Sequence, residues 1–477
     1  MNCRRQLFKH RGWLLGCTLT VIALTISARL QAQTLCTVSG ATYCPGDNAV
    51  YNPAAINAHS FIDASQVTGT GGGTDICALI DAALVNLATS DLLTGATKFT
   101  YAGHGVVDAR NIGGTALVCT YGNPWPSSST AYYWPPAATV LLPAGTIQVT
   151  GTWTLPPGTR LVGEGPQSTI IQATSGLGTV IQMGTTGFCG GDCNGVIVEH
   201  LGIDEHSEGV VGISNNWSQE LNYVNDVSIT NVPTSGTGLM IVGAYDANLG
   251  NAANSGPYSN IYVSGSSTGA GTCVNLIGTY GTRGIHGLNC VGGTAGGTAA
   301  VLLDGSNNTI EDITISNYTE GILIGSQLPA NAQNNVLLNI QGSSVTNLVH
   351  VCGSNASTNC PTTTSNPTDL TFMGISSGSG STNTIVDEVT NTTLSHSSDA
   401  TVALYLVGEP MTSGNYSALG YSRFTSSPSV PAWFSGPTIP SNTSCTANGS
   451  LYSVTSGTTA PTLFGCIGGK WTGLTTH

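Results

Sequence analysis

Residues 198–203 read VEHLGI, and the same arrangement of apolar residues returns at 224–229 as VNDVSI. Apolar residues occupy the first, fourth and sixth positions of each copy. The middle residues of successive copies lie 26, 34, 27, 25, 27 and 33 positions apart. A period of about 20 to 50 residues with a strand-like unit indicates a solenoid, whose turns bury their apolar faces against one another. The further copies are Tyr258/Ile261/Val263, Ile285/Leu288/Cys290, Ile310/Ile313/Ile315, the degenerate Leu337/Ile340/Gly342, and Leu370/Met373/Ile375.

The repeating unit has the chemistry of β-strands. Each copy is short and rich in β-branched residues, and it is followed by Gly, Ser, Thr or Asn. A second apolar strand is expected after most copies, at 209–214, 238–243, 273–278, 299–304, 321–325 and 348–352. Two or three strands per turn, stacked in parallel, predict an all-β fold, a parallel β-helix over residues 139–425. Leucine-rich repeats need a shorter period and a Leu-rich consensus, and neither is present.

The first turns carry a family resemblance. The segments LLPAGT at 141–146, LPPGT at 155–159 and RLVGEGPQSTII at 160–171 resemble the opening of the pectate-lyase superfamily. The lead-in from Phe61 to Arg110 is similar to that of some bacterial members, and the resemblance covers roughly residues 61–408. It implies a right-handed parallel β-helix that is exported by a bacterium. It leaves the reaction open, because the superfamily includes lyases, hydrolases, epimerases, phage tailspikes and adhesins.

The sequence departs from the two best-known enzyme groups of that superfamily. Of the motifs that polygalacturonases carry in order, only a lone His286-Gly287 occurs. Calcium-dependent pectate lyases carry an Asp-rich calcium site and a catalytic Arg. Arg283 is the only Arg among the repeats, and no Asp cluster accompanies it in sequence. The catalytic residues of neither group can therefore be assigned here.

The ends of the chain differ from its middle. Residues 1–32 have a basic start and an apolar stretch too short to span a bilayer, which predicts a signal peptide. Residues 33–138 are expected to form an N-terminal cap, with a helix at 75–87 whose N-cap is Asp75. Four Pro residues then mark a linker after Ser426, and residues 426–477 are predicted to hold this linker and a small C-terminal β module.

Removal of the signal peptide would leave 12 of the 14 Cys, an even number that suits disulfides in an exported protein. For Cys189 and Cys193 a zinc site is the alternative, although no second pair or His lies close by. Pairing of sequence neighbours predicts Cys36–Cys44, Cys77–Cys119, Cys189–Cys193, Cys273–Cys290, Cys352–Cys360 and Cys445–Cys466.

Charge restricts the partners. Five of the 11 Lys and Arg lie in the first 32 residues, so 6 remain against 24 acidic residues. Nucleic-acid binding is excluded, because it depends on phosphate neutralisation by Lys and Arg. A strongly anionic glycan would be repelled unless Ca²⁺ bridged the two, and no other cofactor is expected. We expect a secreted or cell-surface monomer, without membrane insertion after signal removal, that acts on a polysaccharide or binds a glycan.

The densest ionisable cluster is the predicted catalytic site. Carboxylates close to each other raise each other's pKa, and a raised acid beside an ionised one suits glycosidic cleavage. Metal binding and a purely structural, solvated acidic turn are the alternatives. The predicted catalytic residues are Asp204, Glu205, His206, Glu208 and Asp226, with His200 beside them as a substrate-binding residue.

A second group of polar residues lies on later turns. Equivalent positions of consecutive turns stack about 4.8 Å apart, which places His286 over Glu311. A base beside a cation is what eliminative cleavage needs, and an exposed ion pair of little energetic value is the alternative. The further predicted substrate-binding residues are Tyr262, Arg283, His286, Glu311 and Asp312, and no protein-held metal is assigned.

These patterns favour an exported carbohydrate-active β-helix that cleaves a polysaccharide, by hydrolysis rather than elimination. The alternative is a non-catalytic glycan-binding or adhesin-like surface solenoid. The scarcity of charge and the missing motifs support this alternative.

Overall fold

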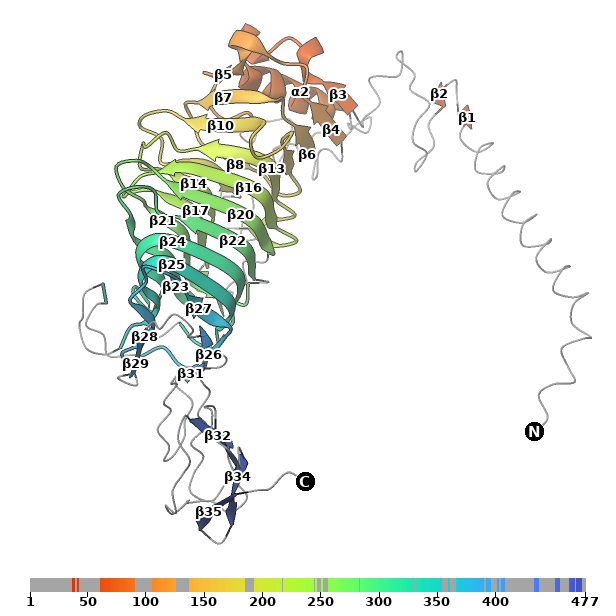
Figure 1. Ribbon diagram of the computed structural model, residues 1–477. Coiled ribbons are helices and arrows are strands. Elements are labelled where there is room, and N and C mark those ends of the chain that lie inside the picture. The colour runs from red at the N-terminus through yellow and green to blue at the C-terminus, as the bar shows by residue number, and fades with distance from the viewer. Residues whose placement is uncertain are drawn as a thin grey trace, which may run out of the picture. The chain divides into compact units, whose positions relative to one another are not determined.

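The computed structural model describes residues 61–90, 105–125, 137–184 and 193–389, and short strands outside these ranges. Gaps within the last range fall at 217, 244, 247–249, 252–255, 283, 329–331, 354–358 and 361–365. The described residues form a right-handed parallel β-helix, which confirms the predicted fold class. Strands stack as successive turns from β3 and β4 to β26 and β27 (Figure 1).

Three columns of parallel strands make the walls of the coil. The first wall consists of β3 (Phe61–Asp63), β4 (Gly105–Asp108), β6 (Ala138–Leu141), β9 (Arg160–Val162), the first parts of β13 (Ile197–Asp204), β16 (Tyr223–Val232), β20 (Tyr258–Gly265), β22 (Ile285–Val291), β24 (Thr309–Ile324) and β25 (Val336–Val351), and β26 (Leu370–Met373).

The second wall begins with β5 (Val118–Cys119), β7 (Gly145–Val149) and β10 (Thr169–Ala173), continues through the later parts of β13, β16, β20, β22, β24 and β25, and ends at β27 (Ile375–Ser377). The third wall consists of β8 (Trp153–Leu155), β11 (Thr179–Met183), β14 (Val211–Asn215), β17 (Thr237–Val242), β21 (Thr272–Tyr280), β23 (Gly297–Ser306), the last parts of β24 and β25, and β28 (Asn383–Asp387). The second strands expected after the repeats lie in this wall.

The repeated apolar residues form one interior file. Leu201 pairs with Val227 and Val227 with Ile261, and the file continues through the partners Ile313 and Ile340. All of these side chains are buried. Residues 26 or 34 positions apart in sequence therefore contact one another laterally, as the period predicts.

The predicted register of the last repeat is wrong by two residues. Leu337 pairs with Phe372 rather than with Leu370. Phe372 and Ile375 are buried, whereas Met373, which was expected inside, is 49% exposed. The physical reason is Gly374, which occupies the bend of this turn and fixes which residues face inward.

That bend recurs in the turns from β13 to β26, where it separates the first wall from the second. Its residues have positive φ, a conformation that Gly, Asn and Asp adopt at least cost and that His adopts occasionally. We call this column the left-handed corner. It consists of His200 (φ 55°), Asp226 (54°), Asn260 (53°), Gly287 (68°), Asp312 (56°), Asn339 (51°) and Gly374 (69°).

An amphipathic helix covers the first turns. Helix α2 (Ile76–Ser90) buries Ile76, Ile80 and Leu84. The Asp75 carboxylate accepts hydrogen bonds from the backbone N–H groups of residues 77 and 78, which confirms it as the N-cap. The disulfide Cys77–Cys119 ties this helix to β5, so the predicted capping helix is present.

Two more predicted disulfides, Cys273–Cys290 and Cys352–Cys360, are also formed. Cys193 and Cys466 are disulfide-bonded, while Cys189, Cys445, Cys36 and Cys44 lie outside the described residues. Disulfides suit an exported protein in an oxidising compartment. No helix among the described residues is long and apolar enough to cross a membrane.

Strands of opposite direction complete the last turns. β29 (Thr392–Ser395), β30 (Thr401–Val402) and β31 (Tyr405–Val407) pair antiparallel with β28, β27 and β26. The predicted C-terminal module is a separate sheet of β32 (Trp433–Gly436), β33 (Leu451–Val454), β34 (Leu463–Ile467) and β35 (Lys470–Gly473). The predicted signal peptide lies outside the described residues. The remaining strands are the short pairs β1 (Thr37–Val38) with β2 (Ala41–Thr42), β12 (Cys193–Asn194) with β15 (Ser218–Glu220), and β18 (Tyr245–Asp246) with β19 (Gly250–Asn251).

Candidate functional site

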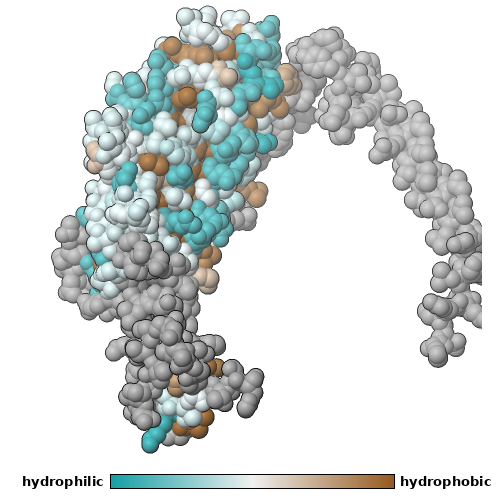
Figure 2. Space-filling model, in the orientation of Figure 1, coloured by the Kyte–Doolittle hydropathy of each residue, from teal (hydrophilic) through white to brown (hydrophobic). Residues whose placement is uncertain are grey.

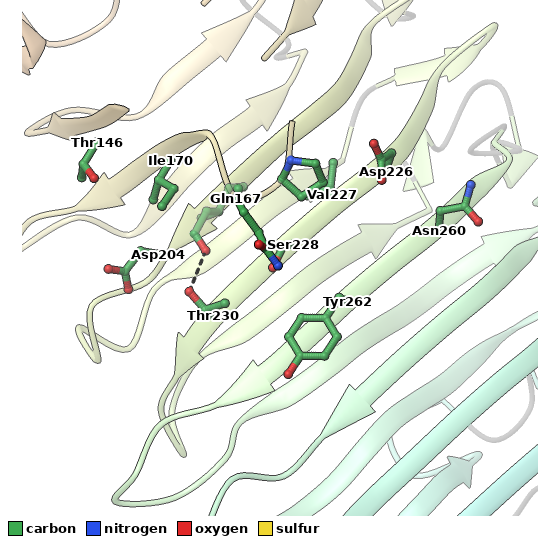
Figure 3. Close-up of a pocket in the computed structure, with 13 residues that line it drawn as sticks. Thr146, Gln167, Ile170, Asp204, Asp226, Val227, Ser228, Thr230, Asn260 and Tyr262 are labelled. Carbon is green, nitrogen blue, oxygen red and sulfur yellow. Dashed lines mark hydrogen bonds between the residues drawn. The ribbon is translucent and has the colours of Figure 1, made fainter. Parts of the chain in front are cut away.

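A groove of about 590 Å³ runs along the outer side of the second wall. On the face of the molecule drawn in Figure 2, near-neutral and hydrophilic residues predominate, and hydrophobic residues form separate patches. The groove draws on several successive turns (Figure 3). It is lined by Thr146, Pro166, Gln167, Ile170, Gly202, Ile203, Asp204, Asp226, Val227, Ser228, Thr230, Asn260 and Tyr262.

The register of the coil supplies the floor of this groove. Gly202 pairs with Ser228, and Ser228 pairs with Tyr262, so the three stack on consecutive turns. Each is the outward residue between two buried ones, as the alternation of a strand requires. The Tyr262 side chain is 39% exposed and offers an aromatic face to the groove.

A turn between β9 and β10 forms one side of the groove. It can approach the second wall because of Gly202, since a Cβ at this position would lie 2.4 Å from the carbonyl oxygen of Pro166. Gln167 from the same turn extends over the floor (Figure 3). The sequence did not predict this side of the groove, because the turn lies before the first repeat.

Asp226 lines one end of the groove, and its carboxylate is hydrogen-bonded to the imidazole of His200, which is not itself a lining residue. His200 Nδ1 lies 2.7 Å from Asp226 Oδ2, and the two side chains are 46% and 42% exposed. Both residues belong to the left-handed corner, where the backbone bend turns their side chains toward each other across adjacent turns. A carboxylate that accepts the Nδ1 hydrogen leaves Nε2 as the proton acceptor, so the pair can move a proton.

Asp204 lies at the other end. Its carboxylate accepts hydrogen bonds from Gln172 Nε2 at 2.8 Å, from Asn231 Nδ2 at 2.8 Å and from the backbone N–H of His206 at 2.9 Å. Three donors from three places in the chain fix its orientation. The side chain borders the groove and can still accept hydrogen bonds from a ligand.

The two groove carboxylates are not close neighbours. Asp204 pairs with Thr230, which lies four residues beyond Asp226, or roughly 13 Å along the strand. Figure 3 shows them on opposite sides of the floor. This separation does not suit the carboxyl distance of about 5–5.5 Å in retaining glycosidases.

Glu205 points away from the groove and into the coil. Its side chain is fully buried, and neither carboxyl oxygen makes a hydrogen bond of ordinary geometry. Gly212 and Gly236 leave room for the carboxyl group, since a Cβ on Gly236 would lie 2.5 Å from Oε2. The pKa of Glu205 is raised to about 9, mainly by burial. The nearby amide of Gly212 lowers this pKa by a smaller amount, and the charge of Asp204 adds to the increase. Glu205 is therefore protonated at neutral pH.

The remaining members of the predicted cluster lie on an outer turn. His206 Nδ1 and Glu208 Oε1 are 4.0 Å apart, with side chains 58% and 30% exposed. Neither lines the groove. The structure thus brings Asp204 and Asp226 to one groove and places the other three predicted catalytic residues elsewhere.

The second predicted group is formed in part. His286 and Glu311 pair in register, and His286 Nδ1 is hydrogen-bonded to the Glu311 carboxylate. Asp312 accepts a hydrogen bond from Asn339 Nδ2 at 2.6 Å. None of these lines the groove, although Tyr262 does. Arg283 lies outside the described residues.

A buried cluster on the third wall was not predicted. His350 Nδ1 lies 3.1 Å from Glu320 Oε2, and its Nε2 lies 3.1 Å from Glu388 Oε1. Burial alone would lower the pKa of His350, but the hydrogen bonds and charges of Glu320 and Glu388 outweigh it and raise the pKa. Glu320 pairs in register with Asn347, three residues before His350. Applying the 27-residue spacing to the second strands would have placed Glu320 beside Asn347 and near His350, but not Glu388, because His350 pairs with Val386, 36 residues further on.

Comparison with known proteins identifies no family. No family model matches the chain, and no curated protein matches it. Among solved structures, the A-module of mannuronan C-5 epimerase AlgE6 from Azotobacter vinelandii is 14% identical with a TM-score of 0.29, and the match covers 53% of this chain and 82% of that chain. ORF18 of Geobacillus virus E2 is 15% identical with a TM-score of 0.28, covering 72% and 79%. The AlgE4 A-module from the same Azotobacter species is 15% identical with a TM-score of 0.25, covering 52% and 82%.

Proposed function

We propose that the protein is an exported carbohydrate-active β-helix of the pectate-lyase type, whose groove binds a segment of polysaccharide and cleaves it. The observation that carries this proposal is Asp226, which lines the end of a groove with Tyr262 on its floor and is hydrogen-bonded to His200 beside the groove. Three disulfides among the described residues support the exported location.

The lining favours a sugar chain. An aromatic ring packs against the apolar face of a sugar, while amide, hydroxyl and carboxylate groups bind its hydroxyls. Tyr262 supplies the ring, and Gln167, Asn260 and Ser228 supply polar groups around it. The charged residues that line the groove are Asp204 and Asp226, so a neutral polysaccharide is favoured over an anionic one. An anionic glycan would need a cation such as Ca²⁺ between its carboxylates and these residues.

The proposed chemistry is proton transfer by the His200–Asp226 pair. The Asp226 carboxylate stabilises the positive charge of the protonated His200 imidazole. His200 accepts a proton from an attacking water or gives one to the departing oxygen. Asp204 is too far along the strand to act as a partner on the same bond in a retaining mechanism, so its role is to bind sugar hydroxyls. The reaction that we propose for this pair is hydrolysis.

A non-catalytic glycan-binding protein is the second candidate. It is favoured by the three donors that already occupy Asp204 and by the distance between the two groove carboxylates. In that case, the His200–Asp226 bond would serve only to hold adjacent turns together.

The test is a comparison of two Asp→Asn variants on a panel of plant and microbial polysaccharides. Asp226→Asn keeps a residue that tolerates positive φ and removes the carboxylate of the pair. Asp369→Asn is the matched control, because Asp369 has φ 55° and does not line the groove. We expect the release of reducing ends to fall about 10²- to 10⁴-fold in Asp226→Asn and to stay unchanged in Asp369→Asn.

Two results separate the candidates. Saccharide binding without product release by the wild-type protein, weakened by Tyr262→Ala but not by Tyr280→Ala, would assign the binding protein instead. Tyr280 is 48% exposed and lies outside the groove, so it controls for loss of a surface tyrosine. Full activity in Asp226→Asn would remove the pair from the mechanism.

A further inference from the structure

The buried cluster on the third wall has the donor atoms of a metal site. The side chains of His350, Glu320 and Glu388 are only 5%, 2% and 17% exposed. Cys360 Sγ lies 3.6 Å from His350 Nε2. One donor atom each from His350, Cys360 and Glu388 lies within 4.8 Å of both others. A nitrogen, a sulfur and an oxygen thus converge on one small volume.

The spacing of these atoms suits tetrahedral zinc. Zinc binds nitrogen and oxygen at about 2.0–2.2 Å and sulfur at about 2.3 Å, so its ligand atoms lie roughly 3.3–3.6 Å apart. The distances from His350 Nε2 are 3.1 Å to Glu388 Oε1 and 3.6 Å to Cys360 Sγ. Thiolate and imidazole ligands favour zinc over the hard cations Ca²⁺ and Mg²⁺.

The surrounding residues already orient these ligands. Glu320 accepts from His350 Nδ1, which leaves Nε2 directed at Glu388 and Cys360. Asn347 and Asn359 donate to the other oxygen of Glu320, at 3.1 and 3.0 Å. A carboxylate behind a metal-binding His is a recurrent feature of zinc sites, where it fixes the ring and raises its basicity.

The second oxygen of Glu388 is also held. The backbone N–H of Gly353 donates to Glu388 Oε2 at 3.1 Å, so Oε1 is the oxygen that faces His350. Each of the two non-sulfur ligands therefore has its own supporting hydrogen bond. This preorganisation reduces what a metal ion would have to rearrange on binding.

The Cys352–Cys360 disulfide decides whether the third ligand is available. The Cys360 sulfur is covalently bound to Cys352 in the oxidised protein, and a disulfide sulfur is a poor substitute for a thiolate as a zinc ligand. We propose that opening this disulfide converts the cluster into a Zn²⁺ site formed by His350, Cys360 and Glu388. A fourth position would then be left for water, as in zinc sites with three protein ligands.

Zinc binding follows reduction of the disulfide. A thiol or phosphine reductant supplies two electrons, the S–S bond breaks, and two protons complete the thiols of Cys352 and Cys360. Zn²⁺ then displaces the thiol proton of Cys360 and the proton shared between His350 and Glu388, and both protons pass to solvent. The chain would exchange a covalent cross-link for a metal cross-link at the same place.

Two variants of the full chain test this proposal without any reductant. Cys352→Ser and Cys360→Ser break the same disulfide, but only Cys352→Ser keeps the thiolate at the ligand position. We expect Cys352→Ser to bind one more equivalent of Zn²⁺ than the wild-type protein in equilibrium dialysis. Cys360→Ser should bind no more Zn²⁺ than the wild-type protein. With Co²⁺ as the probe, Cys352→Ser should show thiolate-to-cobalt charge transfer. Adding Glu320→Gln should weaken its zinc affinity about 10- to 100-fold.

Cys273→Ser controls for a free thiol, since it opens a disulfide elsewhere in the coil and should bind no additional zinc. Equal zinc binding by Cys352→Ser and Cys360→Ser, or binding that survives His350→Gln, would overturn the proposal. Loss of the β-sheet circular dichroism signal in both Cys variants would also overturn it, because the cluster would then not persist without the disulfide.

Discussion

Glu205 follows Asp204 directly in the chain, yet the two carboxyl groups lie in different environments. Asp204 receives three hydrogen bonds at the edge of the groove, and Glu205 is buried in the coil with no partner of ordinary geometry. The repeat spacing predicts which strand residues face inward. It does not extend to the first residue of the following turn, so sequence alone could not separate these two roles.

The environment of Glu205 predicts how stability depends on pH. Its pKa is about 9 in the folded protein, against 4.5 for an unperturbed Glu. Between these two values the folded state retains a proton that the unfolded state loses. The contribution of Glu205 to the free energy of unfolding is therefore full below pH 4.5 and declines as pH rises toward 9. At about 1.36 kcal/mol per pH unit, the loss by pH 7 is on the order of 3 kcal/mol.

Glu205→Gln cannot ionise, and we expect it to remove this decline. Chemical denaturation of the variant should give a higher free energy of unfolding than the wild-type protein at pH 8 and a difference that shrinks toward pH 4.5. Glu164→Gln, at a side chain that is 44% exposed, should leave the pH profile unchanged. Parallel profiles for the wild-type protein and Glu205→Gln would show that Glu205 is not buried as described.

At the scale of the elements, the left-handed corner links the fold to the site. A single backbone conformation, repeated on the turns from β13 to β26, sets the angle between two walls and also presents His200 and Asp226 to each other. The sequence shows this column as Asn, Asp and Gly at one position of the repeat, with His200 as the exception. The predicted alignment of the last turn does not place Gly374 in this column, although Gly is the residue that such a bend most readily accepts.

The corner conformation can be tested at Gly287, where φ is 68°. A Cβ there would lie 3.4 Å from Asn260 Oδ1, which is an ordinary contact, so only the backbone conformation resists Gly287→Ala. We expect a loss of about 1–2 kcal/mol in the free energy of unfolding. Gly178→Ala is the matched control, because φ there is not positive and nothing lies near its Cβ position. Equal stability of the two variants would contradict the bend as described.

Elements outside the repeat were harder to predict. The turn that carries Pro166 and Gln167 forms a side of the groove, but nothing in its sequence marks where it folds against the second wall. By contrast, three disulfide pairings were predicted correctly from sequence neighbours. Neighbouring Cys residues on one turn, or on adjacent turns, are brought together by the coil itself, so sequence proximity is informative in this fold.

At the scale of the whole molecule, the coil turns separation along the chain into a distance across strands. The interior file of Leu201, Val227 and Ile261 is the reason that Gly202, Ser228 and Tyr262 stack outside it. The fold could be predicted because every turn repeats the same pattern of burial. The Glu320–His350–Glu388 cluster was missed because it lies on the outer side of the third wall, where no repeated apolar pattern marks it.

The most direct test is a pair of engineered disulfides across the floor of the groove. Ser228 and Tyr262 are register partners on adjacent strands, about 4.8 Å apart, so Ser228→Cys with Tyr262→Cys should cross-link on mild oxidation. Asn289 pairs with Tyr262 one turn further on, which places it roughly 10 Å from Ser228, and Ser228→Cys with Asn289→Cys should not. Peptide mapping by mass spectrometry should find the first cross-link and not the second. If the adjacent pair stays unlinked, or if the distant pair links equally well, the stacked turns that build this groove are not those of the protein.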